Sequence, residues 1–314
     1  NANLIAKNGL LNQVLVNGAG HEIDATNLTV KAGQGVSLES NENKLNNVFL
    51  DVSGGGILIR NGNAGNDTLK VSISSNLNEL TSDITIHNYN NKVSGETGND
   101  IYVEGLLKTT GNITITNDES DVEVLTSNGV VQGEKVTFNA SGDVHNRNEI
   151  VAEDQVLLNG RNIFNAGSIT TTVGIVDLNA TNDITNIGSI TGATQVDVNA
   201  GNELHLKNGL VTGRTHVIMH AGNNAIFEGT SITGALVDIT SGGNVSMTAG
   251  SINSADGTIN ITANNDISHK NGSIIAKNAN LTAENDIALE DGSLVAQNAN
   301  LIAKNGLLNQ VLVN

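Results

Sequence analysis

Two short segments rich in Gly, Asn and Asp carry the residues best suited to holding a metal ion. Both follow the order Gly-x-x-Gly-Asn-Asp, and they end in Asp67 and Asp100. Carboxylate and carbonyl oxygens presented by a tight turn are the ligands that Ca²⁺ prefers in proteins. The spacing therefore makes Asp67 and Asp100 candidate calcium ligands.

Both segments resemble the calcium-binding nonapeptide of toxin-repeat β-rolls. In that motif the ion lies between successive nine-residue turns, whereas Asp67 and Asp100 are 33 residues apart and neither has a tandem copy beside it. Turns of an inserted loop are the alternative interpretation. We expect no cofactor, with calcium at these turns as the one exception.

Pairs of acidic residues recur at equivalent places of neighbouring repeats. Asp177 and Asp197 are such a pair, and stacked repeats would bring them roughly 5 Å apart. Retaining glycosidases use this spacing, but hydrolysis also needs a raised pKa and a sugar-sized cleft. Only 2% of the residues are aromatic, which is unfavourable for stacking against sugars. We therefore expect solvated acidic ladders and no enzyme, with a polysaccharide-acting enzyme as an alternative.

Insertions interrupt the repeat between about residues 60 and 133. Loops on a rigid scaffold commonly carry recognition. The candidate ligand-binding loops are therefore those of Asn63, Asn66, Tyr89 and Tyr102.

Alternating apolar and polar residues, followed by Gly, Asn or Asp, recur along the chain every 20 to 22 residues. The pattern is clearest in residues 176–184 and 196–204, and less regular copies begin at Leu28, Val48, Leu69 and Ile113. A second apolar row after Gly-Ser keeps the same register, as at Ile169, Ile190, Val211 and Ile232. Period-two alternation predicts strands. A single coil of this length buries almost nothing, so the coils must stack into a solenoid.

The inward residues of one coil are expected to be Val176, Leu178, Ile184 and Ile190, with Ala180 at a tight corner. Positions equivalent to Ala180 hold Ala, Gly or Ser, which predicts that only a small side chain fits there.

Larger and polar side chains have expected places in the same coils. The two phenylalanines Phe138 and Phe164 are expected in the core. Asparagines next to the corner are expected to hydrogen-bond from coil to coil; these are Asn139, Asn159, Asn179 and Asn199.

The first seventeen residues are identical to the last seventeen, residues 298–314, at an offset of 297. We interpret the sequence as a window of a longer chain with a 297-residue tandem repeat; a chance terminal duplication is the alternative. About fourteen coils in that repeat would extend roughly 65 to 70 Å at the spacing of paired strands.

Composition argues against several classes of partner. The formal net charge of −17 repels nucleic acid phosphates and anionic lipids, so we expect no nucleic acid partner and no direct membrane insertion. The chain has no Cys, so it has neither disulfides nor thiolate metal sites.

Several strings resemble the repeats of filamentous haemagglutinin-like exoproteins: Asn-Ala-Gly-Ser-Ile at 165–169, its variants at 186–190 and 271–274, and Leu-Thr-Ala-Glu-Asn-Asp-Ile from Leu281. The resemblance implies a right-handed parallel β-helix, two-partner secretion and an extracellular location on the bacterial cell surface. The secretion domain of that family carries Asn-Pro motifs, and this sequence has no Pro. Autotransporter passengers share the same coil pattern and are the alternative for export.

We therefore expect an all-β chain: one continuous single-stranded, right-handed parallel β-helix over residues 1–314, with about 14 coils of about 21 residues. The expected function is a structural stalk or fibre segment of a large secreted bacterial surface protein, used for attachment or cell-cell contact. The alternative is an adhesin with binding loops on this segment. Expected partners are the chain itself, joined end to end or through the next repeat, and a target-cell surface or glycan.

Overall fold

The computed structural model describes residues 1–13, 15–16, 19–20, 22–62, 69–73, 80–89, 100–118, 120–125 and 129–311. These residues are all-β and form a right-handed parallel β-solenoid of about 13 turns, spaced about 21 residues apart. The predicted fold class is confirmed. Within the same ranges there is no helix that could span a membrane. The chain divides into two compact units, Asn1–Arg161 (unit 1) and Asn162–Asn314 (unit 2).

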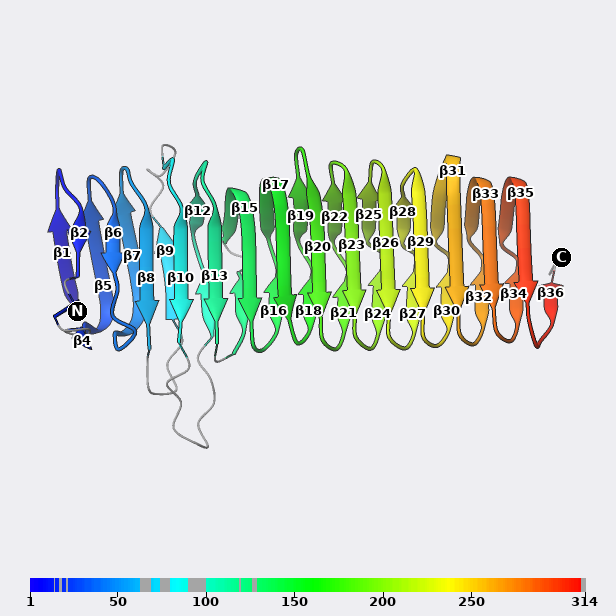
Figure 1. The fold of residues 1–314 in the computed structure, drawn as a ribbon, viewed down its shortest axis with the longest axis horizontal. Coiled ribbons are helices and arrows are strands. Elements are labelled where there is room, and N and C mark those ends of the chain that lie inside the picture. The colour runs from blue at the N-terminus through cyan, green and yellow to red at the C-terminus, as the bar shows by residue number, and fades with distance from the viewer. Residues whose placement is uncertain are drawn as a thin grey trace, which may run out of the picture. The chain divides into compact units, whose positions relative to one another are not determined.

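Each coil of unit 2 runs through three strand positions in a fixed order, which we call ladders A, B and C (Figure 1). Ladder A contains β18 (Ile163–Asn165), β21 (Ile184–Asn186), β24 (Leu204–Lys207), β27 (Ala225–Glu228), β30 (Val245–Thr248), β32 (Ile267–Lys270), β34 (Ile287–Glu290) and β36 (Leu308–Val311). Ladder B contains β19 (Ser168–Thr171), β22 (Ser189–Gly192), β25 (Leu210–Gly213) and β28 (Ser231–Thr233). Ladder C contains β20 (Ile175–Ala180), β23 (Gln195–Ala200), β26 (His216–Ala221) and β29 (Leu236–Ser241).

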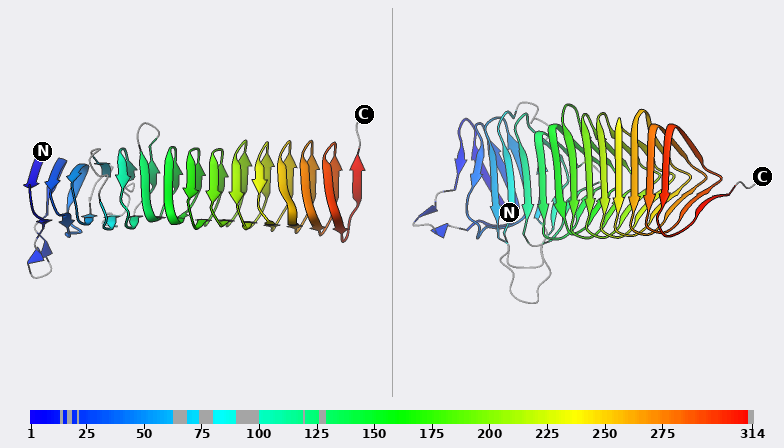
Figure 2. Two further views of the ribbon diagram at one scale, coloured as in Figure 1. Left: turned by 90° about the horizontal axis from the view of Figure 1, so that it is seen from above. Right: turned by 45° about the vertical axis from the view of Figure 1, so that its right-hand side comes forward.

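In the later coils of unit 2 one long strand runs through both B and C. These strands are β31 (Ser251–Ala263), β33 (Ser273–Ala283) and β35 (Ser293–Ala303). Neighbouring coils pair in parallel, residue opposite residue, as with Val176 opposite Val196 and Leu178 opposite Val198. Figure 2 shows these coils, green to red, lying one beside the next.

The interior of unit 2 is a set of apolar rows. Val176, Leu178, Ile184 and Ile190 are all buried, as predicted, because alternate residues of each strand point inward. Ala180 is buried at the corner, and it stands in register with residues that are all small: Ala200, Ala221, Ser241, Ala263 and Ala283. The size limit at this corner is confirmed for unit 2.

Unit 1 uses the same ladder order. Ladder A contains β1 (Ala2–Ala6), β5 (Asp24–Ala32), β7 (Lys44–Val52), β9 (Leu69–Ile73), β11 (Ile101–Val103), β14 (Val122–Val124) and β16 (Val144–Asn146). Ladder C contains β2 (Leu11–Asn12), β6 (Val36–Leu38), β8 (Ile57–Asn61), β10 (Ile84–Asn88) and β13 (Ile113–Asn117). The strands β15 (Val130–Ala140) and β17 (Glu149–Gly160) run through B and C, and β12 (Leu106–Lys108) pairs with the start of β15. The short strands β3 (Leu15–Val16) and β4 (Ala19–Gly20) form an antiparallel pair.

The corner of unit 1 departs from the small-residue rule. The position of Ala140 is occupied in earlier coils by Asn117, Asn88 and Asn61, and all three asparagines are buried. Asn61 Nδ2 donates to Asn88 Oδ1 at 3.1 Å, and Asn88 Nδ2 donates to Asn117 Oδ1 at 3.2 Å. The prediction of a small residue was therefore wrong here. A buried asparagine is tolerated at this corner because its amide hydrogen-bonds to the amide of a neighbouring coil.

The predicted asparagine ladder next to the corner is confirmed between β15 and β17. Asn159 Nδ2 donates to Asn139 Oδ1 at 2.8 Å, whereas Asn179 donates to Asp177 of its own strand at 2.9 Å. Of the two predicted core phenylalanines, Phe138 is buried. Phe164 is only half-buried, because it is the middle residue of β18, where alternation turns the side chain outward.

The turn from ladder A to ladder B in unit 2 has a repeated backbone conformation. Its first residue has a positive φ in five successive coils: Asn208 (53°), Gly229 (59°), Ala249 (54°), Asn271 (52°) and Asp291 (49°). In most of these coils Gly follows, at Gly209, Gly250, Gly272 and Gly292. This left-handed residue sends the chain sharply from one face of the coil to the next.

Candidate functional sites

The turn that enters ladder A carries a row of Asp and Asn residues whose side chains bind the next coil. In unit 1 the N–H of Asp121 donates to Asp100 Oδ1 at 3.3 Å, and the N–H of Asp143 donates to Asp121 Oδ1 at 2.6 Å. In unit 2 Asp183 accepts from the N–H of Glu203 at 3.0 Å. Short carboxylate and amide side chains reach the backbone in this way at turns. The acidic residues therefore connect successive coils.

The candidate calcium ligands have different outcomes. Asp67, Asn63 and Asn66 lie outside the described residues. Asp100 belongs to the turn row, and its second carboxylate oxygen accepts a hydrogen bond from the Tyr102 hydroxyl at 3.3 Å. Both carboxylate oxygens of Asp100 therefore already accept hydrogen bonds. Calcium binding at Asp100 stays a prediction.

Sequence reasoning missed one cluster of possible metal ligands. Asp121, Asp143 and His145 place one ligand atom each within 4.8 Å of the others, with His145 Nε2 3.8 Å from Asp121 Oδ2. Burial raises the pKa of Asp121, the hydrogen bond from the Asp143 N–H lowers it, and the nearby Asp100 and Asp143 carboxylates raise it. Arg161 Nε donates to Asp143 Oδ1 at 2.9 Å, so the cluster already has a counter-cation.

Unit 2 repeats the spacing of this cluster with a different result. Asp183, Glu203 and His205 again give an acid, a second acid one coil later, and a histidine two residues on. Here, however, His205 Nε2 lies 3.7 Å from Glu228 Oε1 of the following coil. Both sites follow one sequence pattern: an acidic residue, and one coil later a second acidic residue with a histidine two positions after it. The acidic neighbour of the histidine differs, because it belongs to the preceding coil in unit 1 and to the following coil in unit 2.

The two tyrosines predicted in ligand loops lie on different ladders of unit 1. Tyr89 follows β10 and stacks on His87, with ring centroids 3.7 Å apart, while His87 Nε2 is 2.8 Å from Asp118 Oδ2. Tyr102 lies on β11, where Lys70 Nζ is 5.9 Å from its ring centroid. Burial raises the pKa of Tyr102, as do the Asp100 and Glu123 carboxylates. Both rings are half-buried, each beside a cationic or titratable partner.

The acid pair considered for hydrolysis lies in register, as expected. Asp177 is directly opposite Asp197 on β20 and β23. Asp177 accepts from Asn179 at 2.9 Å, and both Asp197 oxygens accept from Gln195 Nε2 at 2.8 and 2.7 Å. Burial raises the pKa of Asp177, the Asn179 hydrogen bond lowers it, and the Asp197 charge raises it. Amide donors on the same strands thus hold both carboxylates.

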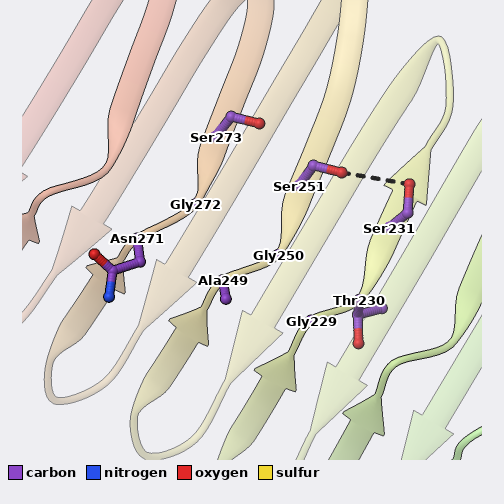
Figure 3. A pocket seen from close by; sticks show the side chains of 9 residues that line it. All are labelled: Gly229, Thr230, Ser231, Ala249, Gly250, Ser251, Asn271, Gly272 and Ser273. Atoms are coloured by element: carbon purple, nitrogen blue, oxygen red, sulfur yellow. Dashed lines mark hydrogen bonds between the residues drawn. The ribbon is translucent and has the colours of Figure 1, made fainter.

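Two shallow hollows lie beside ladder B of unit 2. The first, of about 310 Å³, is lined by the turn residues and first serines of three successive coils (Figure 3): Gly229, Thr230, Ser231, Ala249, Gly250, Ser251, Asn271, Gly272 and Ser273. Ser231 and Ser251 approach to 3.4 Å between their hydroxyl oxygens. The second, of about 350 Å³, includes Arg214 and Asp256 in its lining. The first hollow offers hydroxyls and backbone groups and contains no titratable side chain, so it has no group for acid-base chemistry.

Comparison of the chain with protein-family models, with curated proteins and with solved structures found no match.

Proposed function

We propose that this chain is a structural segment of a secreted bacterial surface protein, in which stacked coils supply length and stiffness to a stalk or fibre. The observation that carries the proposal is the uniformity of the coils. In unit 2 the same three strand positions and buried apolar rows recur from coil to coil, and the same turn conformation recurs in five successive coils. Such repetition serves mechanical extension, because every coil contributes the same backbone pairing to its neighbours.

The likeness of its repeats to filamentous haemagglutinin-like exoproteins supports an extracellular location for this proposal. A second copy, or the next repeat of a longer chain, is the partner that would pair with the exposed strands of a terminal coil. In this proposal the acidic surface, with a net charge of −17, keeps fibres soluble and apart along their sides.

Electron microscopy of the native protein tests the structural function. Thin rods with an axial repeat of roughly 65 to 70 Å, the length expected from strand stacking, would support it. Compact particles without an axial repeat would contradict it. The purified 314-residue chain is the control. Rods longer than one repeat that this chain forms alone come from association, whereas longer rods seen only with the native protein come from additional repeats.

An adhesive surface is the second candidate function, and the aromatic residues of unit 1 favour it. Half-buried Tyr89 and Tyr102 offer rings with a hydroxyl tip, a combination suited to binding sugars or proteins. A Tyr89→Ser, Tyr102→Ser double variant would lose binding to a glycan array or to target cells if this surface is adhesive. Unchanged binding by a variant with an unchanged far-ultraviolet spectrum would exclude these residues.

A further inference from the structure

One inward row of ladder A in unit 2 changes character along the solenoid. The third residue of each strand points inward, and successive coils place there Leu206, Phe227, Met247, His269 and Leu289 in direct register. All five side chains are buried. An ionisable imidazole therefore occupies a position that its neighbours fill with apolar groups.

His269 has no polar partner in this row. Its side chain is 1% exposed, and among the described residues neither Nδ1 nor Nε2 has a hydrogen-bond partner. The neighbours on either side in the row are the thioether of Met247 and the side chain of Leu289. Neutral imidazole tolerates such surroundings at some cost, whereas imidazolium, with two N–H donors, does not.

The ring lies against two glycine turns. A Cβ added to Gly272 would lie 2.8 Å from His269 Nε2, and one added to Gly292 would lie 2.5 Å from Cε1. These glycines follow Asn271 and Asp291, the residues of positive φ that form the turns. The native turns therefore close directly over the imidazole.

No charged group of the surrounding strands faces the ring. β30 carries no titratable residue, and the Lys270 ammonium and Glu290 carboxylate pair with each other at 2.9 Å on the outer face. Other charged groups on the elements around it, Asp256, Lys277 and Asp291, are exposed, and Asp266 and Asp286 belong to the turn row. Burial alone lowers the pKa of His269.

We propose that His269 makes the coils of β30, β32 and β34 acid-sensitive: the neutral ring completes the apolar row, and the protonated ring must leave it. Leaving requires the turns at Gly272 and Gly292 to open, because they cover the ring. The acid sensitivity is confined to these coils, because the same row holds only apolar side chains in the three preceding coils.

The direction of the pH effect follows from linkage. The pKa of His269 is lower in the folded chain than its ordinary value of 6.5, so the open state binds more protons in the interval between the two values. Stability of these coils is complete above about pH 6.5 and falls as the pH drops through that interval. Uptake of one proton raises the opening equilibrium constant by at most about tenfold per pH unit.

Hydrogen exchange of the full chain at pH 7.5 and pH 5.5, corrected for intrinsic exchange rates, tests the proposal. In the wild type, the opening constant of β30, β32 and β34 amides should rise at pH 5.5 by more than threefold and up to about tenfold, because only the interval below about pH 6.5 contributes. His269→Leu, which copies Leu206 and Leu289, should abolish that rise. His269→Met, which copies Met247, is the second variant should the first fail to fold.

The matched control is His220→Leu. His220 is an exposed histidine of β26, whose Nδ1 lies 2.9 Å from Thr240 Oγ1, so this variant should keep the wild-type pH response. An equal acid response in the wild type and in His269→Leu would overturn the proposal, as would a wild type whose amides in these strands do not respond.

Discussion

At the scale of single residues, a row of buried asparagines at the corner of ladder C distinguishes unit 1 from unit 2. Asn61, Asn88 and Asn117 occupy an inward corner that alanine fills elsewhere, and two hydrogen bonds join the three amides from coil to coil. A buried amide is stabilising only while its partners remain, because an unsatisfied donor or acceptor carries a desolvation cost. The middle member of this ladder is therefore the most sensitive.

Asn88→Ala should lower the free energy of unfolding by about 1–3 kcal/mol, because it removes the partner of both Asn61 and Asn117. Urea unfolding followed by circular dichroism measures the change. Asn139→Ala is the control: it removes the half-buried rung with Asn159, and a change of no more than about 0.5 kcal/mol is expected. Equal losses in the two variants would show that burial of the ladder is unimportant.

The Asp177 carboxylate is expected to make a small pH-dependent contribution. Its pKa is raised in the folded chain by burial and by Asp197, so the folded state binds more protons, and its contribution to stability declines as the pH rises through and above 3.8. Asp177→Asn keeps the acceptor for Asn179 and should stabilise at pH 7 by about 0.5 kcal/mol or less, with no gain near pH 3.

Urea midpoints of wild type and Asp177→Asn at the two pH values test this sign. In an Asp197→Asn background the gain should shrink, because one of the two causes of the raised pKa is gone. A larger gain at pH 3 than at pH 7 would contradict the assignment.

At the scale of elements, the turn from ladder A to ladder B determines how sharply each coil bends. Four of the five positive-φ positions hold Gly, Asn or Asp, which tolerate this conformation, whereas Ala249 does not. The first hollow of unit 2 lies along these turns (Figure 3). Ala249 is exposed, so a substitution there can relieve the backbone strain without disturbing the core.

Ala249→Gly should raise the free energy of unfolding by about 0.5–1 kcal/mol, since glycine adopts positive φ without steric cost but loses more chain entropy on folding. Thermal unfolding provides the measurement. The reciprocal change, Gly229→Ala, should destabilise, because a Cβ there would lie 2.4 Å from Asn208 Oδ1. A neutral result for both would show that the turn relaxes freely.

At the scale of the whole molecule, each coil gains its stability from the coils on either side, and the apolar rows are the shared element. In such architectures damage spreads to nearest neighbours and decays with distance. Val198→Asp places a charge at a position 2% exposed in β23 and should deprotect amides of β20, β23 and β26. The amides of β33 should keep wild-type protection, as measured by hydrogen exchange. Uniform loss across unit 2 would instead indicate a single cooperative unit.

Much of this architecture could be predicted from spacing alone. Period-two alternation required strands, the 20 to 22-residue repeat required stacking, and the size of Ala180 and its equivalents located a corner. These features are local and periodic, so the order of residues along the chain is enough to predict them. The resulting core residues, such as Leu178 and Ile190, are buried as expected.

Only the tertiary structure decided on which ladder a strand lies. The copies beginning at Leu28, Val48 and Leu69 belong to ladder A, whereas the copy beginning at Ile113 belongs to ladder C. The identical sequence Ala-Asn-Leu-Ile-Ala forms β1 of ladder A as residues 2–6 and the ladder C part of β35 as residues 299–303. Alternation specifies which side chains point inward, but every face of a coil accepts the same alternation. The ladder is therefore set by the neighbouring coils, and so are contacts such as His145 with Asp121, which differ from those of His205 at the same spacing.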